Sequence, residues 1–392
     1  MKLNESCSLI GLTIQFPNGK RVKVLSLLSD KGKSCVAYNG EIISTDFNGK
    51  EHCEKCIIKE FAPEGFTRNT DVVGKDNYYV SRILPAQKNE FFKAFVKFKT
   101  DMDKIRWDIS DMINEDPALK NYVVNIPDEG NRIFEFNEDN GSYKGIMLFP
   151  YESSDAAEKI KALDISERLN MLVKLCKIID KFHQQNMILI DLKPENFIYY
   201  NDKINSYIKL FDFDSVSAVD ETGLLSSDKI PCGTPFFSSP EVLQQTKSVN
   251  QFSDVYSVGA MLFYFITIDV FDELVLETES FSIRKLKKIL NSTTFELIQK
   301  SEKELTLGFW NKFVYIIKTS MNETRTKRSF NNVDSPIISL SKEIEILKDI
   351  YEHKGVHPEV ILDSAIKLTN DKNFFNEDDF DEKLLCEVEE IV

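Results

Sequence analysis

The feature that most constrains this chain is a polar segment near its middle, set directly after apolar residues. The sequence DLKPEN at residues 191–196 follows the apolar run 187–190, and Asp212 stands between two phenylalanines 21 residues after Asp191. Transfer of a phosphoryl group needs a carboxylate that accepts a hydroxyl proton, a cation that offsets charge, and hard oxygens that hold Mg²⁺. This segment and the later acid supply all of these groups, so the sequence predicts a site for phosphoryl transfer.

The overall charge disfavours a protein that binds nucleic acids. The chain of 392 residues has 49 lysines and arginines against 63 acidic residues, a net charge of −14. Affinity for nucleic acids rests on clustered cations, which this balance does not favour. A nucleotide with its metal can still bind, because local charges and backbone amides decide that. The hydrophobic share of 42% is typical of a folded globular protein.

No segment of the sequence is predicted to enter a membrane. The first ten residues, MKLNESCSLI, lack the apolar run of a signal peptide. The most apolar stretch, residues 255–271, is interrupted by polar residues and is short for a bilayer span, which favours a buried helix. We therefore expect a cytoplasmic protein, although non-classical export to a host would leave no trace in these patterns.

The N-terminal part of the chain has the pattern of an antiparallel sheet. Short β-like runs alternate with Gly and Asn turns, and they lie at residues 9–16, 22–28, 34–38 and 56–59. Residues 60–90 lose this periodicity and are expected to form an inserted loop. A helical pattern follows from Asn89 to about Met112, and two further strands are predicted at residues 132–136 and 145–149.

After the last of these strands the pattern becomes helical. Apolar residues repeat on one face over residues 165–182, with Ser166 as the expected N-cap. We therefore predict an α+β architecture with a β-rich lobe over residues 1–150, which contains one main helix, and an α-rich lobe over residues 151–334. Residues 335–392 are expected to form an acidic, helical C-terminal extension.

The segment at residues 191–196 resembles the catalytic loop of protein kinases, in the form that Ser/Thr kinases carry. Further segments resemble that family in the correct order: CIIK at 56–59, GTPFFSSPE at 233–241, FSDVYSVG at 252–259, and Arg328, which stands where the family pairs an Arg with Glu241. Each match alone is weak, because so short a pattern arises by chance. Together they identify the chain as resembling a member of the protein kinase family, which implies the bilobal kinase fold.

The resemblance implies a role for each polar residue of the site. Asp191 would be the catalytic base that orients the acceptor hydroxyl, and Lys193 would neutralise charge on the γ-phosphate. Thr234 would support both of them, while Asn196 and Asp212 would hold Mg²⁺, with Mn²⁺ as an alternative. The position of Lys193, two residues after the acid, is the arrangement of Ser/Thr kinases. The expected reaction moves the γ-phosphate of ATP to hydroxyl groups of a protein substrate.

The resemblance also implies a set of ATP-binding residues in the β-rich lobe. Lys59 would bind the α- and β-phosphates and would pair with an acid of the predicted helix. That acid is Asp101 in the alignment, with Glu90 as the fallback. The backbone from Phe149 to Tyr151 would meet the adenine, and Leu148 would lie at the rear of the pocket.

The loop over the phosphates departs from the family pattern. Kinases carry three glycines there, because glycine lets the backbone approach phosphates closely. Counted back from Val36, these positions hold Ser29, Lys31 and Ser34, with only Gly32 nearby. The departure leaves two functions open: an active Ser/Thr protein kinase, or a catalytically weak pseudokinase that serves as a scaffold for partners. The protein substrate and the oligomeric state cannot be read from the sequence.

Overall fold

The structure is a computed structural model of the chain. It describes residues 9–29, 34–46, 48–73, 78–124, 127–150, 156–201, 206–211, 213, 215–225, 231, 233–275, 286, 289–301, 305–330 and 335–353. The chain divides into two compact units, residues 1–153 and residues 154–392. Within the described ranges, no helix combines the length and the apolar character that crossing a membrane requires.

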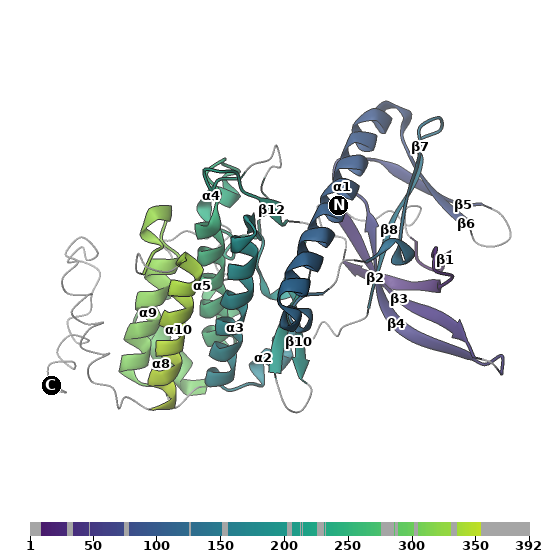
Figure 1. The fold of residues 1–392 in the computed structure, drawn as a ribbon. Coiled ribbons are helices and arrows are strands. Elements are labelled where there is room, and N and C mark those ends of the chain that lie inside the picture. The colour runs from purple at the N-terminus through teal and green to yellow at the C-terminus, as the bar shows by residue number, and fades with distance from the viewer. Residues whose placement is uncertain are drawn as a thin grey trace, which may run out of the picture. The chain divides into compact units, whose positions relative to one another are not determined.

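The first unit is built on an eight-stranded antiparallel sheet. Its strands follow the order β1-β2-β3-β4-β8-β6-β5, and β7 also pairs with β8 (Figure 1). The strands are β1 (Thr13–Gln15), β2 (Arg21–Ser29), β3 (Cys35–Thr45), β4 (Glu51–Phe61), β5 (Arg68–Val73), β6 (Tyr78–Ile83), β7 (Arg132–Asn137) and β8 (Ser142–Pro150). Each strand predicted from the sequence overlaps one of these strands.

The predicted loop over residues 60–90 is wrong for much of its length. β5 and β6 form a hairpin that joins the sheet through β8, where Ser81 pairs with Tyr143 and Arg82 pairs with Ser142. Valine, tyrosine and isoleucine, which favour strands, are present in this segment. Polar residues interrupt the alternation of apolar and polar side chains by which a strand is recognised in a sequence.

One long helix, α1 (Lys88–Glu115), packs on the sheet. Its buried residues recur every three or four positions, which is the spacing of one helix face: Phe91, Phe95, Phe98, Met102, Ile105, Ile109 and Met112. The Phe95 ring contacts Phe61 of β4 and Phe134 of β7. Gly145 of β8 permits this approach, because a Cβ there would lie 2.9 Å from the Phe61 Cβ and 3.0 Å from the Phe95 ring. The predicted helix from Asn89 to about Met112 is confirmed.

The second unit is mainly helical. Its helices include α2 (Ala156–Lys161), α3 (Ile165–Gln184), α4 (Pro240–Leu243), α5 (Gln251–Thr267), α6 (Phe271–Val275), α8 (Ser292–Ser301), α9 (Leu307–Ser320) and α10 (Pro336–Glu352). Two small sheets pair β10 (Phe197–Asn201) with β11 (Ser206–Leu210), and β9 (Met187–Ile188) with β12 (Ser217–Ala218). The predicted α+β class, with one β-rich and one α-rich part, is confirmed.

The N-cap of α3 is Asp164 and not the expected Ser166. The Asp164 carboxylate accepts the backbone N–H of Glu167 at 2.8 Å, and the Glu167 carboxylate accepts the backbone N–H of Asp164 at 3.3 Å. This reciprocal capping box satisfies two backbone donors at once, which explains why the helix begins two residues earlier than the serine would place it.

The core of the second unit lies among α3, α5, α9 and α10, which run side by side in Figure 1. α5 is buried over most of its length, as expected for the apolar stretch in this region. α10 belongs to the same core, because Ile337, Leu340 and Ile344 are fully buried. The C-terminal extension expected from residue 335 therefore begins as a helix of this unit, and residues 354–392 lie outside the described residues.

Candidate active site

Three polar side chains of the second unit form a closed triangle of hydrogen bonds. Lys193 Nζ donates to Asp191 Oδ2 and to Thr234 Oγ1, both at 2.8 Å. Thr234 Oγ1 in turn donates to Asp191 Oδ1 at 2.8 Å, although the two residues are 43 positions apart in the chain. The side chains of Asp191 and Lys193 are 14% and 23% exposed, so both are partly open to solvent.

Asn196 is held beside this triangle by its amide nitrogen. It ends the short helix η5 (Pro194–Asn196), is 6% exposed, and donates from Nδ2 to the backbone oxygen of Asp191 at 2.7 Å. This bond occupies the amide nitrogen and leaves the amide oxygen as a hard ligand of the kind that Mg²⁺ prefers. The other predicted metal ligand, Asp212, lies outside the described residues. Phe211, the residue before Asp212, donates its backbone N–H to the backbone oxygen of Asn196 at 2.9 Å.

A buried acid of α5, Asp254, holds the backbone just before Asp191. Its carboxylate accepts the backbone N–H groups of Leu189 at 3.0 Å and Ile190 at 2.9 Å, and it lies 2.9 Å from His183 Nε2. Ile190 has a φ of 71°, a left-handed conformation that β-branched residues rarely adopt. The hydrogen bonds to Asp254 offset this strain and fix the start of the loop. The sequence predicts no role for Asp254, although a lone acid in so apolar a helix is itself a signal.

A buried ion pair fixes the segment that carries Thr234. The two terminal nitrogens of Arg328 donate to the Glu241 carboxylate at 2.6 Å and 3.0 Å, and Arg328 is fully buried. Ser253 Oγ donates to the same carboxylate at 2.7 Å. Burial alone would raise the pKa of Glu241, but the hydrogen bonds and charge of Arg328 hold that pKa below its ordinary value. The predicted pairing of Arg328 with Glu241 is confirmed.

In the first unit, Lys59 lies on one face of β4 and is 4% exposed. The strand register places Ala37 of β3 and Met147 of β8 directly beside it, on the same face. The Lys59 ammonium lies 5.7 Å from the centre of the Phe149 ring, which also belongs to this face. A small residue and an aromatic ring therefore flank the lysine.

Two predicted ATP-binding residues, Val36 and Leu148, lie on the opposite face of the sheet. Both belong to a buried core cluster with Tyr38 and Ile58, away from the Lys59 side chain. Successive side chains of a strand point to opposite faces, so an error of one position in an alignment moves a residue to the wrong side. The structure therefore brings Ala37 and Phe149, rather than Val36 and Leu148, to the face of Lys59.

The predicted pairing of Lys59 with Asp101, or with the fallback Glu90, stays a prediction. A different acid of α1, Asp103, pairs with the sheet, where its Oδ1 lies 2.5 Å from a terminal nitrogen of the buried Arg132. This pair, which the sequence does not predict, ties α1 to the first residue of β7.

The remaining predicted lid and hinge residues are only partly described. Ser29 is the last residue of β2 and pairs with Ala37, and Ser34 accepts the backbone N–H of Ala62 at 2.9 Å through its own backbone oxygen. Lys31, Gly32 and Tyr151 lie outside the described residues.

The fold and the Asp191 site together define a class of protein, and comparison with known families identifies it. A model of the protein kinase domain matches residues 132–355, which is more than half of the chain. The chain therefore belongs to the protein kinase family. The match begins at β7, so β1 to β6 and α1 precede it.

Several named kinases are similar to part of this chain. Calcium/calmodulin-dependent protein kinase type 1 of Caenorhabditis elegans is 34% identical over 94 residues, which cover 24% of this chain and 26% of that protein. MAP kinase-activated protein kinase 2 of Drosophila melanogaster is 26% identical over 147 residues, 36% of this chain and 39% of that protein. Serine/threonine-protein kinase MPS1 of Encephalitozoon cuniculi is 30% identical over 122 residues, 30% of this chain and 20% of that protein. The aligned part thus spans well under half of each relative.

Proposed function

We propose that this protein kinase transfers the γ-phosphate of ATP to serine or threonine hydroxyls of a protein substrate. The triangle of Asp191, Lys193 and Thr234 is the observation that carries this proposal. Asp191 orients the acceptor hydroxyl and accepts its proton, while Lys193 offsets charge on the moving phosphoryl group. Thr234 holds both side chains in that arrangement. The preference for serine and threonine rests on the position of Lys193, two residues after Asp191, and on the similarity to serine/threonine-protein kinase MPS1.

The chemistry of Asn196 fits a divalent cation. Its amide oxygen and the Asp212 carboxylate would hold Mg²⁺, or Mn²⁺ in its place, and the metal would neutralise charge on the ATP phosphates. The bond from Asn196 Nδ2 to the Asp191 backbone keeps the amide from rotating, so the oxygen stays available to the metal.

The strand register supports a shift of one residue in the expected glycine positions of the phosphate loop. Kinases carry the pattern G-x-G-x-x-G-x-V, whose valine lies on the face of the phosphate-binding lysine. Ala37 is the residue beside Lys59 on that face. Counted back from Ala37, the glycine positions become 35, 32 and 30, and Gly32 takes the middle one. We infer that Gly32 supplies the close backbone approach to the phosphates.

A second candidate function is a kinase-fold scaffold with weak or no catalysis. It is favoured by one observation, that Gly32 is the only glycine among residues 29–35 of the sequence. Larger residues at the other glycine positions restrict the approach of the backbone to the phosphates. The two candidates differ in phosphoryl transfer, so activity decides between them.

The deciding experiment incubates the purified chain with labelled ATP, Mg²⁺ or Mn²⁺, and a generic basic protein. We expect labelled serine and threonine with the wild type and a loss of about 10²–10⁴-fold in kcat for Asp191→Asn. The matched control is Asp349→Asn, an exposed acid of α10, which should keep full activity. Transfer no higher than in Asp191→Asn, together with a nucleotide-induced rise in melting temperature, would favour the scaffold.

A further inference from the structure

The first unit contains a cavity of about 550 Å³ beside the end of β8. Pairing of β7 with β8 ends at Met147, so residues 148–150 continue past β7 and form one wall. The last turns of α1 form the facing wall. The short helix η3 (Pro117–Asn121), the loop before β7 and residues Lys20, Ile42 and Glu54 contribute further lining. A volume of this size is in the range of sites for small organic molecules.

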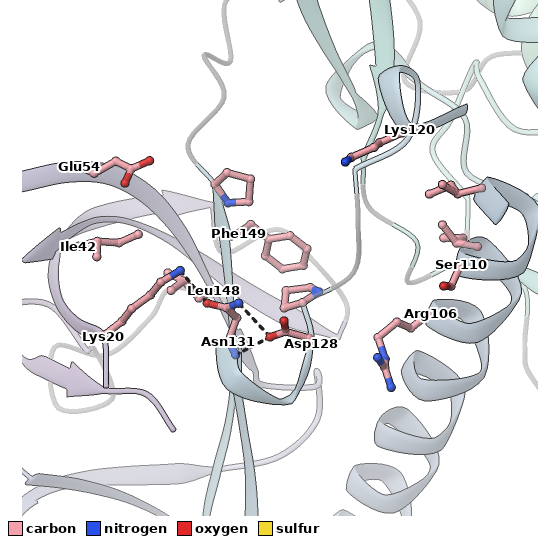
Figure 2. A pocket seen from close by; sticks show the side chains of 14 residues that line it. Lys20, Ile42, Glu54, Arg106, Ser110, Lys120, Asp128, Asn131, Leu148 and Phe149 are labelled. Carbon is pink, nitrogen blue, oxygen red and sulfur yellow. Dashed lines mark hydrogen bonds between the residues drawn. The ribbon is translucent and has the colours of Figure 1, made fainter. Parts of the chain in front are cut away.

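The middle of the cavity is apolar, and Figure 2 shows Leu148 and the Phe149 ring there, between the strand residues and α1. Further apolar lining residues are Ile42, Ile109, Ile113, Pro127 and Pro150. Lys59, the phosphate-binding lysine expected in the same unit, is not among the described lining residues. An apolar surface of this kind would hold the hydrocarbon or aromatic part of a ligand.

The two ends of the cavity differ in charge. Figure 2 shows Lys20 and Glu54 at one end, where opposite charges are present together, and Arg106, Ser110 and Lys120 at the other. The Asp128 carboxylate, which also lines the cavity, accepts the backbone and side-chain N–H groups of Asn131 at 3.1 Å and 2.9 Å. That acid is therefore engaged in its own loop, and the described lining residues that α1 and η3 contribute include two cations, Arg106 and Lys120, and no acid.

Arg106 is the residue that indicates what the cavity binds. Its Nε is buried and has no hydrogen-bond partner among the described residues. The guanidinium contacts the ring of Trp107 on the same helix, 4.8 Å from the ring centre. Buried polar groups are nearly always hydrogen-bonded, so an unpaired donor at a cavity wall calls for a partner. The guanidinium suits a carboxylate, sulfonate or phosphate group, which accepts two parallel hydrogen bonds.

We propose that this cavity binds a small amphipathic organic anion. The anionic group of the ligand meets Arg106 and Lys120, with Ser110 as a further hydroxyl partner. Its apolar part lies on Ile109 and Phe149. The lining calls for a ligand with both an anionic group and an apolar part. An inorganic ion would leave the apolar middle empty, and a neutral hydrocarbon would leave the Arg106 Nε unpaired.

The test uses anilinonaphthalene sulfonate, an amphipathic anion whose fluorescence rises in apolar sites, with the full chain. A non-hydrolysable ATP analogue and Mg²⁺ are present at saturation, so that the probe cannot occupy the nucleotide site. We expect one bound probe per chain, displaced by octanoate but not by equal concentrations of 1-octanol or octylammonium. Arg106→Gln should weaken the binding of the probe and of octanoate about tenfold, because it removes hydrogen bonds to a charged group.

Further variants locate the site. Ser110→Phe, which places a ring at the cavity wall, should weaken binding as much as Arg106→Gln does. Lys104→Gln removes an exposed lysine of α1 that does not line the cavity, and it should bind as the wild type does. Melting temperatures verify that each variant is folded, and Lys120→Gln, at an exposed position, provides a second removal of charge if Arg106→Gln unfolds.

Three results would overturn the proposal. Equal affinity of the wild type, Arg106→Gln and Lys120→Gln would show that the positive end binds nothing. Displacement by 1-octanol as strong as that by octanoate would make the site merely apolar. Absence of probe binding once the nucleotide analogue is present would assign the probe to the nucleotide site.

Discussion

The two units differ in how their predicted site residues are connected. In the second unit, Asp191, Lys193 and Thr234 bond to one another, and Asn196 bonds to the backbone of Asp191. In the first unit, Lys59 lies beside the Phe149 ring and Ala37, and the strand register sets these neighbours. The difference teaches that direct side-chain hydrogen bonds, some from distant segments such as Thr234 and Asp254, fix the geometry of a loop. The side chains of a site on a sheet instead depend on the register of the strands and on the rotation of the packed helix. A shift of one residue along a strand turns its side chains to the opposite face of the sheet.

The largest expected effect comes from the ion pair that holds the Thr234 segment. Arg328→Leu leaves the Glu241 carboxylate buried without its cation, which costs about 3–5 kcal/mol of the free energy of unfolding. Urea unfolding of the purified chain measures this loss. Lys327→Leu, an exposed neighbour, is the control and should change the free energy of unfolding by less than about 0.5 kcal/mol. Equal stability of the two variants would show that the pair does not hold the second unit together.

The same pair predicts a pH dependence. The pKa of Glu241 is lower in the folded protein than its ordinary value of 4.5, so its contribution to stability is complete above that value. The contribution is lost as the pH falls through the lowered pKa, because the unfolded chain then binds the proton first. The stability gap between the wild type and Arg328→Leu should therefore shrink as the pH falls from 7 to below 4.5. Unfolding curves over this range measure it, and a gap that does not change with pH would contradict the assignment.

Much of the second unit could be predicted because its signals are local. The DLKPEN segment places an acid, a lysine and an asparagine on one tight loop, and Thr234 and Arg328 follow in fixed order. Asp254 was not predicted to hold the loop, since a sequence does not show that Leu189 and Ile190 direct their backbone N–H groups at a helix far along the chain. The strain at Ile190 is equally invisible in sequence, because isoleucine is not a residue that signals a left-handed turn.

Less of the site in the first unit could be predicted, and the errors have a common physical cause. The sequence correctly predicts the strand that carries Lys59. It also assigns Val36 and Leu148 to the ATP site, but the residues on the Lys59 face of the sheet are the next ones in the chain, Ala37 and Phe149. Sequence alone gives the period of a strand and not its phase when residues on both faces are apolar. The acid of α1 is subject to the same ambiguity, because rotation of the helix by one residue would exchange Asp101 for a neighbour, and its pairing with Lys59 stays a prediction.

The next effect tests the connected triangle directly. Thr234→Val keeps the shape of the side chain but removes both of its hydrogen bonds, one of which binds the Asp191 carboxylate. Loss of about 1.5–3 kcal/mol should lower kcat about 10–100-fold. Single-turnover transfer to a protein substrate measures it. Thr324→Val, at an exposed position whose side chain makes no cap bond, should keep the wild-type rate. A wild-type rate in Thr234→Val would mean that the direct bond between Lys193 and Asp191 suffices.

A smaller effect concerns the packing of α1 on the first sheet. Gly145→Ala forces a Cβ against Phe61 and the Phe95 ring, and such overpacking costs about 1–3 kcal/mol of the free energy of unfolding. The cost should be smaller when Phe95→Leu is also present, because the smaller side chain makes room. A double-mutant cycle by urea unfolding measures this coupling. Additive effects of the two substitutions would show that α1 does not approach β8 as closely as the contacts indicate.

The smallest effect decides which face of the first sheet meets ATP. Ala37→Leu enlarges a half-buried residue beside Lys59, so it should weaken ATP binding about tenfold, or about 1.4 kcal/mol, with little loss of stability. Val36→Leu adds volume to the buried core cluster, so it should lower the free energy of unfolding by about 1–3 kcal/mol and leave ATP affinity unchanged. Calorimetric titration with ATP and urea unfolding separate these two effects. Weaker ATP binding in Val36→Leu and lower stability in Ala37→Leu would be the opposite result. It would place Val36 on the face that meets ATP, and the glycine positions would then be those of Ser29, Lys31 and Ser34.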